Sequence, residues 1–232
     1  MIKRAFVTGT SSGIGLGIAQ QLLNEGWHVS GIDRTAAVIE HAQFTPVTVD
    51  LTREEDSIAA INSLLRQQVP DALVHCAGVL RVAPLGKLLV SDGELMWQLH
   101  VKAASLIANA VLPAMQAAQR GRVILLGSRV SKGIAGRSQY AASKAAIVAL
   151  ARSWAAEVVK DGVTVNVVSP AATNTRMLSD PLRASASPRL PPIGRLIEPS
   201  EIAALVSFLL SSQASAITGQ DIAICGGASL SY

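Results

Sequence analysis

The sequence predicts one α/β domain, in which helices cover both faces of a parallel sheet. Short apolar runs rich in β-branched residues alternate with helical patterns along all 232 residues. The apolar runs are nearly continuous, which is typical of strands buried on both faces. Strands separated by helices imply right-handed crossovers between parallel neighbours. We find no linker, internal repeat or low-complexity tract, so residues 1–232 are predicted to form a single domain.

Seven strands and five helices are expected. The apolar runs predict strands at residues 5–8, 28–32, 47–49, 72–75, 123–126, 164–168 and 222–224. The helical patterns between them lie at 14–25, 54–68, 94–119, 139–160 and 200–210. The third strand is expected to begin only after Pro46, which ends a connection too short for a full crossover helix. Thr52-x-x-Glu55 and Ser91-x-x-Glu94 have the pattern of capping boxes and predict two helix starts.

Composition excludes several classes of protein. Half of the residues are apolar and 16% are charged, the opposite of a disordered chain. No apolar run reaches the roughly 20 residues of a membrane-spanning helix, and the first residues lack a signal-peptide layout, so we expect a cytoplasmic protein without membrane contact. The net charge of +4 is scattered, and three Phe, three Trp and two Tyr are too few for base stacking, so no nucleic-acid partner is expected. Two cysteines and four histidines lack ligand spacing, which predicts no metal and no disulfide.

A glycine-rich turn follows the first predicted strand. Residues 8–15 read Thr-Gly-Thr-Ser-Ser-Gly-Ile-Gly and lead directly into a helix. Glycines there let the backbone approach a diphosphate, and the helix N-terminus offers free N–H groups. Alone, the pattern also fits a plain turn. Asp33 ends the second strand, however, where a carboxylate can accept hydrogen bonds from both ribose hydroxyls of an adenosine, so the two features predict a dinucleotide site.

Asp33 also predicts NAD(H) in preference to NADP(H). Its carboxylate would repel a 2′-phosphate by about 4 kcal/mol at an effective dielectric constant of about 20, before screening. Arg34 has the opposite effect and favours NADP(H), because its side chain can swing over such a phosphate. We favour Asp33, since its short side chain cannot retreat whereas an arginine can turn to solvent.

A second constellation consists of Ser128 and the run from Tyr140 to Lys144. Tyr140 and Lys144 are four residues apart on a predicted helix and share one face. A nearby ammonium lowers a tyrosine pKa from about 10 towards neutrality, as general acid/base catalysis requires. Ser128 closes the preceding strand, where its hydroxyl can hold a substrate oxygen. A Tyr and a Lys on a helix surface are the alternative, but open α/β sheets bind ligands at this end of their strands.

With these residues in this order, the chain resembles the short-chain dehydrogenase/reductase family over nearly its whole length. Further matches are Asp50-Leu51, residues 75–78 (His-Cys-Ala-Gly), 166–170 (Asn-Val-Val-Ser-Pro) and 218–227. The resemblance implies a doubly wound, Rossmann-type sheet, a nicotinamide cofactor, and a homodimer or homotetramer. It implies Tyr140 as proton donor and acceptor, Lys144 on the nicotinamide ribose and Ser128 orienting the carbonyl or alcohol.

The resemblance also completes the expected cofactor site. The residues expected to bind the cofactor are Gly9, Ser11, Ser12, Gly13, Ile14, Gly15, Asp33, Arg34, Asp50, Leu51, Ala77, Gly78, Tyr140, Lys144, Pro170, Ala171, Thr173 and Thr175. Among them, Asp50 would contact adenine and Thr175 matches a threonine that contacts the cofactor in the family.

Two positions depart from the family pattern. His100 stands where the family usually has an asparagine of the proton relay, and we name it as a candidate catalytic residue because imidazole can both donate and accept a hydrogen bond. A hydrogen-bonded core histidine is the alternative. Ala171 replaces the usual glycine after the sixth strand. His75 and Cys76 are expected to be structural.

The expected function is hydride transfer between a nicotinamide cofactor and a secondary alcohol or ketone that is a small-molecule substrate, a cyclic diol being one candidate. Alternative substrates are 3-oxoacyl thioesters and hydroxysteroids. A non-catalytic or regulatory dinucleotide-binding homologue is the alternative from another class, and His100 and Ala171 favour it. Enoyl reductases of this superfamily space their Tyr and Lys more widely, which argues against that activity here.

The long connection at residues 171–198 is expected to be a substrate lid. It contains four prolines, and long loops in compact domains often cover functional sites. Four arginines against one aspartate in residues 176–195 favour an anionic or polar substrate. A solvated basic loop is the alternative.

Overall fold

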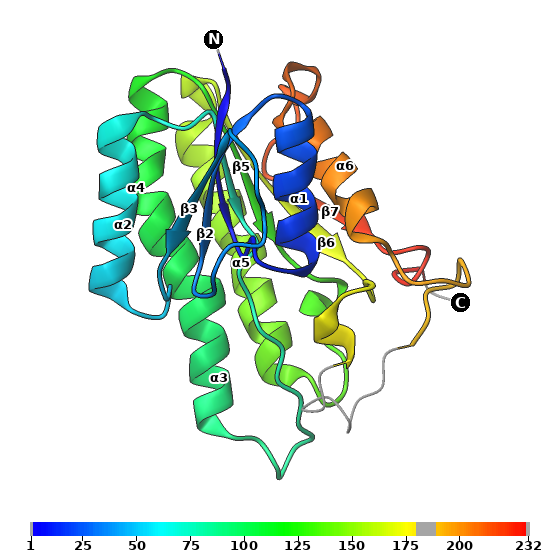
Figure 1. The fold of residues 1–232 in the computed structure, drawn as a ribbon. Coiled ribbons are helices and arrows are strands. Elements are labelled where there is room, and N and C mark those ends of the chain that lie inside the picture. Colours follow the sequence, from blue (N-terminus) through cyan, green and yellow to red (C-terminus); the bar gives the residue numbers. More distant parts are fainter. Residues whose placement is uncertain (1, 180–188, 231–232) are drawn as a thin grey trace.

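The computed structural model describes residues 2–179 and 189–230, and its core is one seven-stranded parallel sheet between two helical layers (Figure 1). The strands are β1 (Arg4–Thr8), β2 (His28–Asp33), β3 (Phe44–Thr48), β4 (Ala72–His75), β5 (Gly121–Leu126), β6 (Val163–Pro170) and β7 (Asp221–Ile224). Their order in the sheet is β3-β2-β1-β4-β5-β6-β7. Every neighbouring pair is parallel, which confirms the predicted doubly wound, Rossmann-type sheet.

The order of the strands determines where a ligand can bind. The chain runs outward from β1 to β3, then returns to place β4 on the other side of β1. The connections that leave β1 and β4 therefore diverge to opposite faces and leave a crevice at the carboxyl ends of these two strands.

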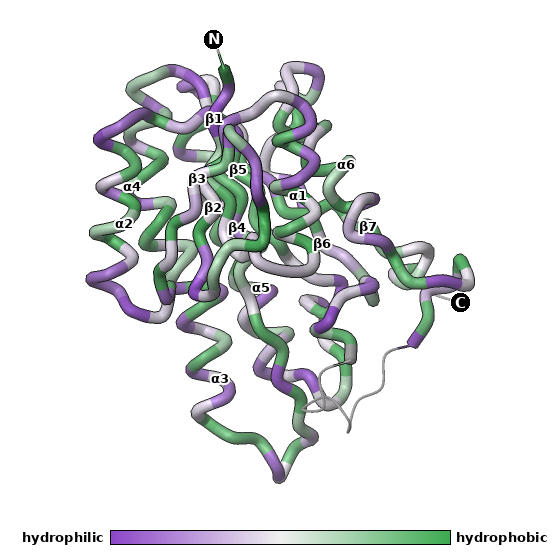
Figure 2. The backbone as a smooth tube through the Cα atoms, viewed as in Figure 1, coloured by the Kyte–Doolittle hydropathy of each residue, from purple (hydrophilic) through white to green (hydrophobic). Residues whose placement is uncertain are grey.

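Two apolar cores lie on the two faces of the sheet. The helices are α1 (Gly13–Asn24), α2 (Glu54–Gln67), α3 (Val90–Trp97), α4 (Ala103–Ala117), α5 (Ser138–Val158) and α6 (Pro199–Leu210). One core joins the strands to α2, α4 and α5, and the other joins them to α1 and α6. Figure 2 shows the strands as mainly apolar segments between these layers, the pattern that burial on both faces requires.

The third strand begins earlier than the sequence predicts. β3 starts at Phe44 and includes Pro46, which lies opposite Gly31 of β2. Proline has no N–H to donate and is tolerated on an edge strand. Because β3 pairs only with β2, it is such an edge, and the prediction that Pro46 precedes the strand is wrong.

Neither predicted capping box forms. The residues that precede the first turns of α2 and α3 are Arg53 and Leu89, and neither caps its helix through the side chain. Thr52 instead donates both its amide (3.0 Å) and its hydroxyl (2.8 Å) to Asp50 Oδ1. The helix expected at 94–119 begins at Val90 and contains a π-helical segment, Gln98–Lys102, between α3 and α4.

In the described part of the chain, no helix is both long and apolar enough to cross a membrane.

Candidate active site

A cleft of about 290 Å³ opens at the carboxyl ends of β1, β2 and β4. Most of the expected cofactor-binding residues line it: Gly9, Ser12, Gly13, Ile14, Gly15, Asp33, Arg34, Asp50, Leu51, Ala77, Gly78 and Thr175. Ser11 is not among the lining residues and instead contributes its amide to Asp33.

Two glycines allow the first turn of α1 to approach the sheet. Gly9 has a φ of +76°, and a Cβ there would lie 3.0 Å from the amide nitrogen of Ala77. A Cβ on Gly15 would collide with the carbonyl oxygen of Gly9. The first residues of α1, Gly13, Ile14 and Gly15, line the cleft, so the N-terminus of the helix fits a bound diphosphate.

Asp33 is held in a defined orientation at the rim of the cleft. Its Oδ2 accepts the Ser11 N–H at 2.9 Å, and its Oδ1 accepts the amide (3.1 Å) and the hydroxyl (3.0 Å) of Thr35. Two carboxylate oxygens offer about four acceptor sites, so one further donor can be accommodated. A ribose hydroxyl supplies such a donor. The shape of the turn and the acceptor at its rim fit an adenosine dinucleotide.

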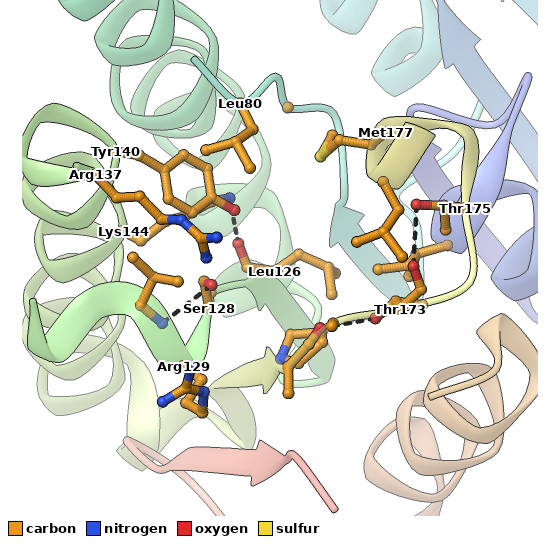
Figure 3. A pocket seen from close by; sticks show the side chains of 18 of the residues that line it. Leu80, Leu126, Ser128, Arg129, Arg137, Tyr140, Lys144, Thr173, Thr175 and Met177 are labelled. Atoms are coloured by element: carbon orange, nitrogen blue, oxygen red, sulfur yellow. Dashed lines mark hydrogen bonds between the residues drawn. The ribbon is translucent and has the colours of Figure 1, made fainter. Parts of the chain in front are cut away.

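A second cavity, of about 150 Å³, contains the three residues expected to carry the chemistry, and for that reason we refer to it as the catalytic cavity. Ser128 follows β5, and Tyr140 and Lys144 lie on α5, with side chains that are 7%, 9% and 6% exposed. Figure 3 shows Tyr140 and Ser128 facing the same cavity. The amide of Val130 donates to Ser128 Oγ at 3.2 Å, which orients the serine hydroxyl.

Lys144 is buried, and its ammonium is directed by the backbone. Nζ donates to the carbonyl oxygen of Leu126 at 2.7 Å and lies 5.8 Å from the centre of the Tyr140 ring. Burial lowers the pKa of Lys144 to about 8, while the neighbouring Cys76 acts in the opposite direction. The amine therefore remains mostly protonated at neutral pH, and its charge favours the phenolate form of the tyrosine.

His100 lines the same cavity and is almost completely buried, with 1% of its surface exposed. The Val79 N–H donates to Nε2 at 3.0 Å, so the ring proton is on Nδ1, which donates to Ser143 Oγ at 2.9 Å. Ser143 in turn donates to the Tyr140 carbonyl at 2.9 Å. Burial, with help from Lys144 and His75, holds the pKa of His100 well below its usual value, so the ring is neutral.

His75 makes a similar connection beneath the cofactor cleft. Its Nε2 donates to the carbonyl oxygen of Leu99 at 3.1 Å, and the Thr8 hydroxyl donates to its Nδ1 at 3.2 Å. Leu99 lies in the π-helical segment. Thr8 Oγ1 also accepts the amides of Cys76 and Ala77. The position of His75 agrees with its expected structural role.

The two cavities meet. Ile14, Cys76, Gly78, Val79, Thr175 and Met177 line both of them. Pro170, Ala171 and Thr173 line the catalytic side, and the Thr173 hydroxyl donates to the Ala171 carbonyl at 3.0 Å. A ligand that extends from the cleft past Gly78 would thus reach Tyr140 and Ser128.

Sequence reasoning missed several residues that line the catalytic cavity. Val79, Leu80, Val130 and Met177 form apolar walls, and Arg129 and Arg137 add two guanidinium groups. The sequence positions of the two arginines could have identified them, because Arg129 follows Ser128 directly and Arg137 precedes Tyr140 by three residues. Among the described residues, no group of three or more His, Cys, Asp or Glu side chains is arranged to hold a metal ion.

The expected lid is only partly described, because residues 180–188 of the proposed segment lie outside the described residues. Arg176–Ser179 form a short 3₁₀ helix, from which Met177 and Leu178 line the catalytic cavity. Arg195 pairs with Glu201 through two bonds of 2.7 and 2.8 Å, so its charge is not available to a substrate. Arg189, by contrast, lines the catalytic cavity, so the expectation of an anionic or polar substrate stays a prediction.

Comparisons with known proteins agree with this architecture. A family model described as Enoyl-(Acyl carrier protein) reductase matches residues 9–229. The 3-oxoacyl-[acyl-carrier-protein] reductase FabG of Vibrio cholerae is 35% identical over 97% of this chain and 96% of its own length. A solved structure of a short chain dehydrogenase/reductase family protein has a TM-score of 0.88 and 32% identity, covering 98% of this chain and 97% of its own. A structure of ElxO with NADP bound has a TM-score of 0.90 at 22% identity, with coverage of 98% and 99%, and is similar in fold.

Proposed function

This chain belongs to the short-chain dehydrogenase/reductase family, and we propose that it interconverts a secondary alcohol and a ketone with NAD(H) as the preferred cofactor. The family assignment makes it an oxidoreductase that binds a nicotinamide cofactor. The substrate, the preference for NAD(H) and the individual roles below are part of the proposal.

When bound, the nicotinamide supplies or accepts the hydride. The Tyr140 hydroxyl gives a proton to the carbonyl oxygen in reduction, or takes it from the alcohol in oxidation. Ser128 donates a hydrogen bond to the same oxygen. Lys144 binds the nicotinamide ribose, and its charge favours the phenolate form of Tyr140.

His100 serves as a positioning residue in this proposal. Both of its ring nitrogens are engaged, one by the Val79 amide and the other by Ser143. It acts through Ser143 on the first turns of α5, which carries Tyr140. A proton carrier would need a free nitrogen facing the reacting oxygen.

One observation carries the proposal: Ser128, Tyr140 and Lys144 share one buried cavity that opens into the cofactor cleft. This arrangement also counts against the non-catalytic alternative, because cofactor binding alone does not require Ser128 and Tyr140 to face the same cavity beside Lys144. Tyr140 and Lys144 are four residues apart, closer than in the enoyl reductases of this superfamily, so we favour carbonyl chemistry. Relatives named as 3-oxoacyl-[acyl-carrier-protein] reductases keep 3-oxoacyl thioesters among the candidate substrates.

Tyr140→Phe tests the mechanism, since it removes one oxygen and keeps the ring. We expect turnover of the best ketone to fall by about 10²- to 10⁴-fold, the usual contribution of general acid/base catalysis, with little change in cofactor affinity. Steady-state kinetics and fluorescence titration with NADH would measure the two effects.

The exposed Ser138, which begins α5, provides the control. Ser138→Ala also removes one hydroxyl from this helix, outside both cavities, and should leave turnover unchanged. Wild-type turnover by Tyr140→Phe would exclude the mechanism.

A further inference from the structure

We propose that the substrate of this enzyme carries a carboxylate, which Arg137 and Arg129 bind beside the reacting carbon. The proposal rests on the function proposed above, because it places the anion in the same cavity as Ser128 and Tyr140. It also distinguishes this protein from an enzyme that accepts only neutral ketones or thioesters.

The positions of the two arginines are the first argument. Arg137 precedes α5 by one residue and Tyr140 by three, and its guanidinium group reaches into the cavity beside Tyr140 (Figure 3). Arg129 directly follows Ser128 and donates from Nη1 to the Ala228 carbonyl at 3.0 Å. This bond fixes the side chain and uses only one of the five guanidinium N–H groups.

The charge balance of the cavity is the second argument. Arg129 and Arg137 are both half-buried, and Lys144 and Arg189 add two further positive charges. No Asp or Glu occurs among the described residues that line this cavity. Burial lowers the pKa of Arg137, Tyr140 acts in the opposite direction, and the like charge of Arg129 lowers it by a smaller amount. The two guanidinium groups are therefore close enough to repel each other. A bound anion would relieve that repulsion.

The remaining walls indicate what kind of anion fits. Val79, Leu80 and Val130 are apolar, and the cavity of about 150 Å³ is small. A planar guanidinium group matches a carboxylate with two parallel hydrogen bonds. The chemistry therefore suits a compact ketone or secondary alcohol with an apolar body and one carboxylate.

A matched pair of substrates tests the proposal. We would measure kcat/KM for 3-oxocyclohexanecarboxylate and for its methyl ester, with NADH as cofactor. Wild type should prefer the acid. Arg137→Gln should reduce the acid-to-ester ratio by about 10- to 100-fold, the range expected when a hydrogen bond to a charged group is lost. Arg129→Gln should reduce the ratio in the same direction.

Lys132→Gln is the matched control. Lys132 lies on the same 3₁₀ segment as Arg129 (Arg129–Lys132), is exposed and does not line the cavity. The substitution changes the net charge by the same amount, so it should leave the ratio unchanged. A thermal unfolding curve for each variant shows whether it is folded. Arg137→Lys keeps the positive charge but loses the planar guanidinium group, so its acid-to-ester ratio should lie between those of the wild type and Arg137→Gln.

Equilibrium binding separates this proposal from the proposed function. Cyclohexanecarboxylate, titrated calorimetrically into the enzyme with NAD⁺, should bind to wild type and Lys132→Gln and lose at least 10-fold in affinity with Arg137→Gln. Such binding without turnover of any ketone would overturn the proposed function and leave the anion site standing. Turnover of the ester, with no arginine-dependent preference for the acid and no binding of the carboxylate, would overturn the anion site alone.

Discussion

The carboxylate of Asp33, at the edge of the cleft, is oriented by the protein before any ligand binds. Three hydrogen bonds, from Ser11 and Thr35, hold its carboxylate at the end of β2. The pKa of Asp50 is lowered chiefly by the hydrogen bond from the Thr52 amide, and the exposed Arg34 adds a smaller electrostatic contribution in the same direction. Part of the positive charge that could attract a 2′-phosphate is therefore offset within the protein.

We predict that Asp33→Ser shifts cofactor preference towards NADPH. The change removes a charge that repels a 2′-phosphate and an acceptor for a ribose hydroxyl, so kcat/KM should fall with NADH and rise with NADPH. The ratio of the two should change by about 10-fold or more, since repulsion of up to about 4 kcal/mol is reduced by screening at an exposed rim.

Steady-state kinetics with both cofactors would measure this ratio. Arg34→Gln in the Asp33→Ser background should reverse part of the gain with NADPH. Equal kcat/KM values for NADH and NADPH in the wild-type enzyme would show that Arg34 outweighs Asp33.

The π-helical segment between α3 and α4 connects several elements of the site. His75 at the end of β4 donates to the carbonyl of Leu99, and His100 links the backbone at Val79 to Ser143 of α5. The two neutral imidazoles thus join the cofactor cleft to the helix that carries Tyr140 and Lys144. A π-helical turn at such a place agrees with the frequent occurrence of these segments at functional sites.

We predict that His100 and Ser143 are energetically coupled. His100→Leu leaves the half-buried Val79 amide without its acceptor, and Ser143→Ala leaves the buried His100 Nδ1–H without its own, so each should destabilise the fold by about 1–3 kcal/mol. In the double variant the imidazole is absent, so the loss of the Ser143 hydroxyl leaves no His100 Nδ1–H without an acceptor.

The double variant should therefore cost less than the sum of the two single changes, by roughly 0.5–3 kcal/mol. Urea unfolding of the four proteins completes the cycle. Additive effects would mean that the hydrogen bond between these side chains contributes nothing to stability.

The stability of the whole molecule should depend on keeping its buried histidines neutral. Burial, assisted by Lys144, lowers the pKa of His75 to about 4, against 6.5 for the exposed side chain. The pKa values of His100 and His28 are lowered in the same direction. Below pH 6.5 the unfolded chain therefore binds protons that the folded chain does not, and acidification favours unfolding.

We predict that His75 alone removes about 2 kcal/mol of stability between pH 7 and pH 5, which corresponds to a fall in Tm of about 4–8 °C for a chain of this size. His75→Gln keeps a donor for Leu99 and an acceptor for Thr8 but does not titrate in this range. Calorimetric unfolding across this pH range should show a shallower decline for the variant. Parallel declines in both proteins would exclude His75 as a source of the acid sensitivity.

Local patterns in the sequence were sufficient to predict the strands of the sheet and the main features of the candidate site. Continuous apolar runs predicted all seven strands within a few residues, because burial on both faces demands such runs. The turn at Gly9 and the pair Tyr140 and Lys144 were recognisable because close backbone approach and helical spacing are local properties. The predicted start of β3 failed because the tolerance of Pro46 depends on the strand being at the edge, which no local pattern contains.

The tertiary structure alone decided what surrounds these groups. His100 connects two elements of the site, because its two ring nitrogens form hydrogen bonds with the Val79 amide and the Ser143 hydroxyl, both distant from it in the sequence. Arg129 and Arg137 entered the catalytic cavity because the ends of β5 and α5 converge there. Sequence spacing can place side chains on one face of a helix, but burial and charge balance arise from packing between elements. The sequence therefore predicted the reaction class and favoured an anionic or polar substrate, whereas the part of Arg129 and Arg137 in the substrate site emerged only from the fold.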